Sequence, residues 1–171
     1  MRGWHRIIRS REVQPSAPPD RETAALLAAR IEAASQVRLG RSLALLHVDA
    51  GSCGGCELEL RALANVFHDL ERLGLRFTTT PRHADVLLVT GPATRNLADA
   101  VQQSYAAMAD PKWVMAIGDC AVDGGVFKGS YAVLGGIAPL VQVDLAIPGC
   151  PPKPESILAG LRALLEANAR S

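Results

Sequence analysis

The chain has 171 residues, which is enough for one domain with a substantial core and too few for two ordinary domains. Its net charge of +1 and its aromatic content of 4% give little basis for phosphate attraction or base stacking, so we expect no nucleic-acid partner. No apolar run approaches the roughly 18 residues that span a bilayer, and the basic start does not resemble a signal peptide. We therefore expect a cytoplasmic protein, in which four cysteines favour metal or redox chemistry over disulfides.

The first 40 residues are expected to lie outside the main domain. Residues 1–20 read as an extension and a Pro-rich linker. Helical spacing would place Trp4, Ile7 and Ile8 on one face of an amphipathic segment, although a solvated terminus explains so short a piece equally well. Residues 21–40 predict an Ala-rich helix, and residues 41–171 form the domain.

Strand and helix patterns alternate from Ser42 onward. The run 43–48 predicts a buried strand, and a tight turn and a helix follow it. That helix is expected to run from Glu57 to near Gly74, with an apolar stripe that includes Leu58 and Leu70. Strands rich in Val, Ile and Leu that alternate with helices imply an α/β fold with a mostly parallel sheet, and we expect the flavodoxin-like, doubly wound order. The further expected elements are strands at 75–79, 84–90, 113–117 and 141–147, and helices at 95–108 and from 154 onward.

The four cysteines follow three of the predicted strands. Cys53 and Cys56 come after the first strand, and Cys120 and Cys150 come after the strands at 113–117 and 141–147. Because the carboxyl ends of parallel strands share one edge of a sheet, all four thiols are expected to meet there.

Several chemistries could use these thiols. The Cys53 to Cys56 spacing alone suits a thioredoxin-like redox pair as well as a metal, but a redox pair leaves Cys120 and Cys150 unexplained. Four thiolates can hold a structural zinc ion or a [4Fe–4S] cluster. Zinc usually takes two tight pairs, so the dispersed cysteines favour the cluster, and a zinc-stapled interaction module remains an alternative.

Four ordered blocks of the sequence are informative together: residues 51–59, 81–92, 116–121 and 147–155. They resemble the small, cluster-bearing subunit shared by complex I, where it is the 20 kDa subunit, and the membrane-bound [NiFe]-hydrogenases. The resemblance covers about residues 43–166. It implies a flavodoxin-like domain with one [4Fe–4S] cluster at the carboxyl edge of the strands, bound by Cys53, Cys56, Cys120 and Cys150.

The first block separates the branches of that superfamily. Complex I subunits of this type carry two adjacent cysteines, whereas two glycines stand between Cys53 and Cys56 here, as in the energy-converting, formate-hydrogenlyase-like (group 4) hydrogenases. The resemblance therefore implies an oxidoreductase subunit without catalytic residues of its own, which relays electrons between ferredoxin-like subunits and the NiFe centre of a large subunit. It also implies membrane subunits as partners and a position on the inner face of the cell membrane. A complex I-type subunit that passes electrons to quinone is the alternative.

A few residues near the cysteines are candidates for supporting roles. Glu59 matches a family glutamate that could transfer protons or bind the large subunit, but acidic residues also simply favour helix starts, which is our interpretation of Glu57. We interpret His47 as a core residue and His68 as a helix-surface residue, and we assign no site to His83. The glycines expected to bring backbone close to sulfur are Gly54, Gly55, Gly118 and Gly149.

Overall fold

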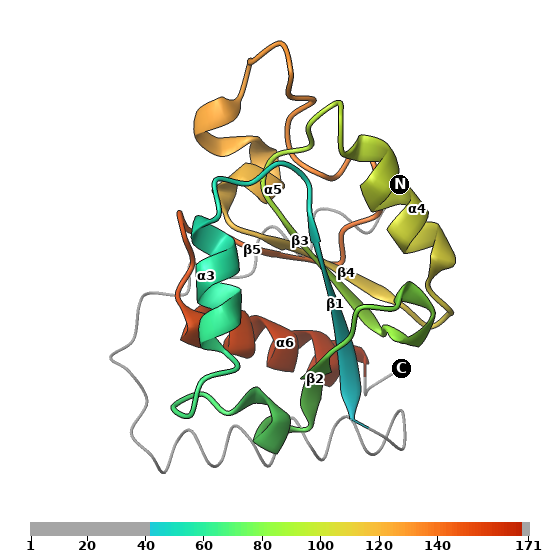
Figure 1. Cartoon of the computed structure of the whole chain (residues 1–171), viewed down its shortest axis with the longest axis vertical. Helices are drawn as coiled ribbons and strands as arrows, with labels where there is room; N and C mark the ends of the chain where they lie inside the picture. The colour runs from blue at the N-terminus through green and yellow to red at the C-terminus, as the bar shows by residue number, and fades with distance from the viewer. Residues whose placement is uncertain (1–41, 169–171) are drawn as a thin grey trace.

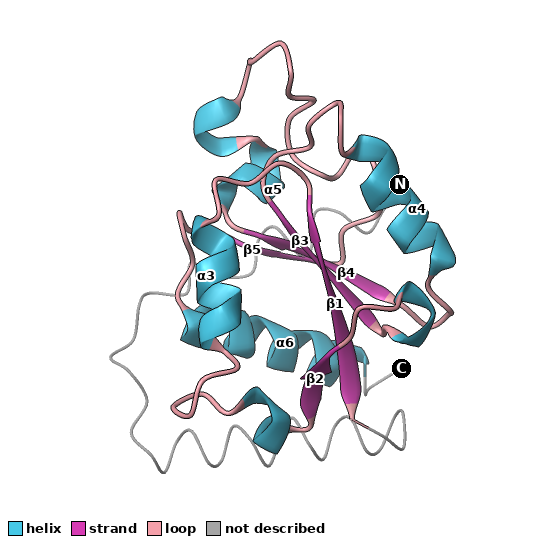
Figure 2. Ribbon diagram, viewed as in Figure 1, coloured by secondary structure: helices cyan, strands magenta, loops and turns pink. Residues whose placement is uncertain are grey.

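The structure is a computed structural model that describes residues 42–168. The predicted extension at 1–20 and helix at 21–40 lie outside these residues. Five parallel strands form one sheet in the order β2-β1-β3-β4-β5, which confirms the flavodoxin-like, doubly wound prediction (Figures 1 and 2). The strands are β1 (Leu43–Asp49), β2 (Leu75–Phe77), β3 (Val86–Thr90), β4 (Trp113–Ile117) and β5 (Leu145–Ile147).

Helices cover both faces of this sheet (Figure 2). The α-helices are α3 (Gly55–Ala62), α4 (Ala98–Ala107), α5 (Asp119–Asp123) and α6 (Pro154–Asn168), and the short 3₁₀ helices are η1 (Leu70–Leu73), η2 (Pro81–His83) and η3 (Gly125–Phe127). Because both faces are covered, every residue of β3 and β4 is buried, as their apolar sequences predict.

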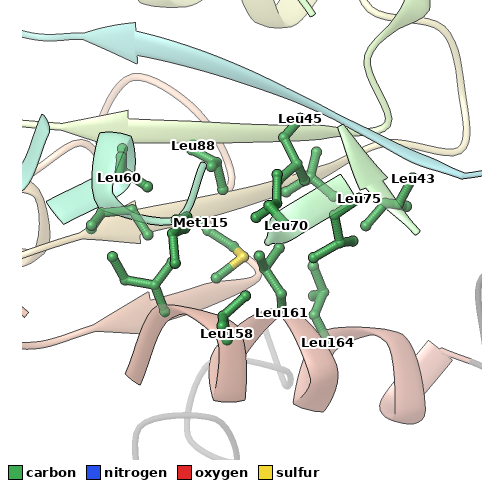
Figure 3. Packing of buried hydrophobic residues seen from close by; sticks show 14 of the residues in the cluster. Leu43, Leu45, Leu60, Leu70, Leu75, Leu88, Met115, Leu158, Leu161 and Leu164 are labelled. Atoms are coloured by element: carbon green, nitrogen blue, oxygen red, sulfur yellow. The ribbon is translucent and has the colours of Figure 1, made fainter. Parts of the chain in front are cut away.

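The larger hydrophobic core lies between the sheet and the pair of helices α3 and α6. Met115 of β4 packs there with leucines of the neighbouring strands and with Leu158 and Leu161 of α6 (Figure 3). A second core on the opposite face contains Val101 of α4 and Ala121 of α5. The sheet is therefore packed between two apolar layers, which fix its position in the fold.

The parallel register brings four strand ends to one edge. Asp49 pairs with Thr90, Thr90 with Ile117, and Ile117 with Ile147 across the sheet. These residues end strands β1, β3, β4 and β5 in turn. The segments that follow these four strands therefore all begin at the same edge of the sheet.

The helix predicted from Glu57 to Gly74 is wrong in its length and in its buried face. Helix α3 ends at Ala62, and turns lead from it to η1. The Asn65 side chain accepts hydrogen bonds from the backbone N–H groups of Phe67 and His68, and this local turn competes with a continuing helix. The predicted apolar stripe fails as well, because Leu58 is 64% exposed.

Two further expectations need correction. The last strand begins at Leu145 instead of residue 141, because Val141 turns into the core on the α4 face of the sheet. The strand predicted at 75–79 is also shorter, because β2 ends at Phe77. Helix α5, which follows β4, places Cys120 inside a helix.

Candidate metal centre at the sheet edge

The turn after β1 carries Cys53 and is held by its own polar groups. The Asp49 carboxylate accepts hydrogen bonds from the backbone N–H groups of Gly51, at 2.8 Å, and Ser52, at 2.6 Å. The Ser52 hydroxyl donates to Glu57 at 2.8 Å and accepts from the backbone N–H of Gly54 at 3.1 Å. These bonds fix the strand-to-helix turn on both sides of Cys53, and this thiol is exposed.

The loops that carry the other two dispersed cysteines are tied directly to each other. The backbone N–H of Asp119 donates to the carbonyl of Gly149 at 2.9 Å, and the backbone N–H of Gly149 donates to the Asp119 carboxylate at 2.7 Å. Cys120, which is buried, follows Asp119, and Cys150, which is exposed, follows Gly149. The two thiols therefore occupy adjacent positions at the carboxyl edge of β4 and β5.

The electrostatics of the thiols place all four in one region. Burial, and after it the negative charges that Cys120, Cys53 and Cys150 carry as thiolates, raise the pKa of the Cys56 thiol from its ordinary value of 9.0 to about 11. Burial and the charge of Cys150 also raise the pKa of Cys120, against a backbone hydrogen bond from Val126 that lowers it. Such mutual repulsion requires short separations. Four thiolates gathered here would need a positively charged group among them.

Glycines leave the sulfurs accessible. A Cβ atom on Gly118, which has φ +88°, would lie 2.5 Å from the Cys56 sulfur, and one on Gly125 would lie 2.9 Å from the Cys120 sulfur. A Cβ on Gly55 would contact the Cys53 sulfur at 3.7 Å. Side chains at these positions would displace or cover the thiols, so the glycines preserve a space for a group bound to sulfur.

The four thiols are donors of the kind that metals with sulfur ligands need. Thiolates bind both zinc and the irons of a [4Fe–4S] cluster, which takes four cysteines, one for each iron. Among the residues from 42 to 168, no group of three His, Cys, Asp or Glu side chains is arranged around a single metal ion. The number and type of the donors therefore match the ligand set of such a cluster.

The remaining candidates lie around this edge. Glu59 is on α3, partly exposed, three residues after Cys56. His47 is half-buried in β1 and shares a 2.9 Å hydrogen bond with the Thr90 hydroxyl, so it is satisfied within the fold as predicted. His68 lies on a turn, which corrects its assignment to a helix, and His83 is exposed in η2.

The sequence interpretation missed the three polar residues that shape the cysteine loops. Asp49, Ser52 and Asp119 hold these loops through the bonds described above. A signal was present for the first pair, because an Asp followed two residues later by Gly-Ser is typical of a side-chain-to-backbone turn. The partner of Asp119 is 30 residues away, so no local pattern could reveal it.

Comparisons with known proteins show the family to which the chain belongs. Residues 53–164 match the family model described as NADH ubiquinone oxidoreductase, 20 Kd subunit. The chain belongs to this family. The probable membrane-bound hydrogenase subunit mbhJ of Pyrococcus furiosus is 43% identical over 132 residues, which cover 77% of this chain and 79% of that protein. The resemblance drawn from the four sequence blocks is thereby confirmed.

A solved structure is similar to this chain in fold and sequence. A chain from the membrane-bound sulfane sulfur reductase, an archaeal respiratory membrane complex, superposes with a TM-score of 0.69 and 28% identity, covering 86% of this chain and 77% of that one. Both relatives belong to membrane-bound assemblies. Within residues 42–168, no helix combines the length and apolar character needed to cross a bilayer. The chain thus belongs to a family of oxidoreductase-complex subunits, and its four cysteines lie at one edge of the sheet.

Proposed function

We propose that this chain is the electron-transfer subunit of a membrane-bound, hydrogenase-type complex, with one [4Fe–4S] cluster bound by Cys53, Cys56, Cys120 and Cys150. The observation that carries the proposal is the meeting of four thiols from three strand ends at one edge of the sheet. The 43% identity to a membrane-bound hydrogenase subunit supports the choice of complex.

The cluster supplies one-electron redox chemistry when it is bound. The protein contributes the rest. The four thiolates ligate iron, the glycines let backbone approach the sulfurs, and burial of Cys56 and Cys120 keeps water from part of the site. Exposure of Cys53 and Cys150 leaves one side of the site near the surface, where an electron partner can approach.

The partners follow from this role. A large subunit would carry the NiFe centre, a ferredoxin-like iron–sulfur subunit would exchange electrons with the cluster, and membrane subunits would hold the assembly at the inner, cytoplasmic face of the cell membrane. The chain itself needs no catalytic residue in this scheme. Glu59, on α3 beside the second cysteine, is proposed to contact the large subunit or to transfer protons to it.

The alternative is a complex I-type subunit that passes electrons from its cluster to quinone, and the name of the matching family supports it. The two glycines between Cys53 and Cys56 favour the hydrogenase branch. Purification of the intact complex separates the two. Nickel in the large subunit with hydrogen evolution or uptake supports the hydrogenase, and quinone reduction without nickel supports the alternative. Reduction of sulfane sulfur instead would place the chain with its structural neighbour.

The cluster itself is tested by metal analysis of protein kept anaerobic throughout. We expect about four irons and four sulfides per chain and an EPR signal after reduction by dithionite. Cys120→Ser and Cys150→Ser should each remove that signal. Stoichiometric zinc without iron would overturn the electron-transfer proposal and leave a zinc-stapled interaction module.

A further inference from the structure

Three pairs of neighbouring strand segments are joined by the same two hydrogen bonds. In each pair an aspartate donates its backbone N–H to a carbonyl of the neighbouring segment, and its carboxylate accepts the backbone N–H of that same residue. The pairs, each with the N–H to carbonyl distance first, are Asp85 with Ala44 (2.8 and 2.8 Å), Asp144 with Val114 (2.9 and 2.8 Å) and Asp119 with Gly149 (2.9 and 2.7 Å). We call each such pair an aspartate clamp.

The clamps lie at opposite ends of the sheet. Asp85 and Asp144 each stand directly before a strand, so their clamps close the end where the strands begin. Asp119 and Gly149 both follow strands, so their clamp closes the cysteine edge. The same backbone device therefore occurs once beside the thiols and twice far from them.

The clamp at the cysteine edge sits between two candidate ligands. Cys120 and Cys150 are the next residues after Asp119 and Gly149. Gly149 has φ +135°, and a Cβ there would lie 2.7 Å from the Cα of Pro152, so this end of the clamp is fixed by close packing. The two bonds of Asp119 thus join the two cysteine loops directly, next to the backbone hydrogen bond that the N–H of Gly118 donates to the carbonyl of Ile147 at 2.8 Å.

The Asp119 carboxylate also acts on the thiols through its charge. Asp119 directly precedes Cys120, and its Oδ1 lies 2.7 Å from the backbone nitrogen of Gly149, the residue before Cys150, so its negative charge stands beside both of these ligands. Reduction of a cluster by one electron adds negative charge at the same place.

We propose that Asp119 is a positioning and potential-setting residue for the cluster. Its carboxylate oxygen holds the Cys120 and Cys150 loops at the spacing that the cluster requires, and its negative charge lowers the midpoint potential. The electron comes from a ferredoxin-class donor, reduces the cluster and then leaves it for the large subunit. This inference rests on the proposed function, because it requires the cluster.

Substitutions that separate the two effects are available. Asp119→Asn keeps an oxygen that can accept the Gly149 N–H but removes the charge. Asp119→Ala removes both, and Asp119→Glu keeps the charge but displaces the oxygen by one methylene. Asp144→Asn and Asp144→Ala are matched controls, since Asp144 makes the same clamp on the same two strands, roughly 10 Å or more away at about 3.3 Å per residue.

The complex carrying each variant is purified anaerobically and measured for iron per chain, for the EPR spectrum of the reduced state and for midpoint potential at one pH. We expect Asp119→Asn to retain its iron and its EPR line shape with a more positive midpoint potential. Asp119→Ala should lose iron, and Asp119→Glu should retain iron with an altered line shape. Both Asp144 variants should match the wild type in all three measurements.

The outcomes distinguish this inference from the proposed function. An Asp119→Asn potential equal to that of the wild type and of Asp144→Asn overturns the charge role. Wild-type iron content and line shape in both Asp119→Ala and Asp119→Glu overturn the positioning role. If Asp119→Ala does not fold, as judged by circular dichroism, Asp119→Glu decides the positioning role by itself. A wild-type protein with no cluster overturns the proposed function and this inference together.

Discussion

The two ends of the sheet use the same backbone device in different surroundings. Where the strands begin, the Asp85 clamp is buried among apolar side chains, and only 4% of Asp85 is exposed. At the cysteine edge, the Asp119 clamp lies among glycines with positive φ and beside Cys120 and Cys150. The first end is buried in the apolar core, whereas at the second end the thiols of Cys53 and Cys150 are exposed. Substitutions at the two ends should therefore fail in different ways.

Leu161→Ala should give the largest loss of stability. The Leu161 side chain is fully buried in the core between the sheet and α6, so its truncation leaves a cavity that costs about 2–5 kcal/mol in free energy of unfolding (Figure 3). Chemical denaturation measures the loss, and the EPR spectrum of the folded fraction should not change. Val126→Ala is the control, because its side chain is 80% exposed. An equal loss in both variants would contradict the assignment of the core.

Gly118→Ala should act at the other end, mainly on the cluster. A side chain at φ +88° and ψ 158° costs about 1–3 kcal/mol by itself, and the new Cβ would displace the Cys56 sulfur, which lies 2.5 Å from that position. We expect most of the iron to be lost, as measured by iron per chain.

Gly129→Ala is the matched control for this substitution. Gly129 has a similar φ of +84°, but nothing lies within 4 Å of its Cβ position. This variant should also be strained by its positive φ but should keep its iron. Iron loss of equal size in both variants would mean that backbone strain, and not the space around sulfur, is responsible.

Asp85→Ala should destabilise the protein without touching the cluster. The substitution leaves the buried N–H of Ala44 without its carboxylate acceptor, at a cost of about 1–3 kcal/mol. Asp85→Asn keeps an acceptor oxygen and should recover part of this loss in denaturation experiments. A change of midpoint potential in either variant would contradict the prediction that substitutions where the strands begin leave the cluster unaffected.

His47→Gln should have the smallest effect, seen only as a change in pH dependence. Burial lowers the pKa of His47 below 6.5, partly opposed by the charges of Glu57 and Asp49 and reinforced by Arg61. The unfolded chain then binds more protons between the folded pKa and 6.5, so the stabilisation from the neutral imidazole is present above 6.5 and is lost as pH falls through the folded pKa. The free energy of unfolding should therefore decline less on acidification in the variant.

The control for this pH effect is His83→Gln, because His83 is exposed in η2. Its pH dependence should match that of the wild type. A wild-type slope in His47→Gln would show that another group titrates in this range.

The local sequence predicted the elements that have a clear apolar pattern of their own. The apolar run at 113–117 matches β4 residue for residue, and the run at 43–48 matches β1 to within one residue. Where a side chain competes with the backbone, prediction failed. Asn65 turns the chain after α3, and a continuing helix had been expected there.

The site was predictable in part because topology is simple in a parallel sheet. Strands of similar apolar character place their carboxyl ends on one edge, so the meeting of Cys53, Cys120 and Cys150 followed from the order of strands and cysteines. The burial of Cys120 in α5 was not predictable, since it depends on the backbone of α5 packing against β4.

The sequence by itself determined the α/β class, the positions of the cysteines after the strands and the family to which the chain belongs, because each rests on residue type and spacing along the chain. Only the tertiary structure decided the order of the strands, the raised pKa of Cys56 and the pairing of Asp119 with Gly149. These depend on distances between residues that are far apart in the sequence, and such distances are fixed only when the two apolar layers pack the sheet.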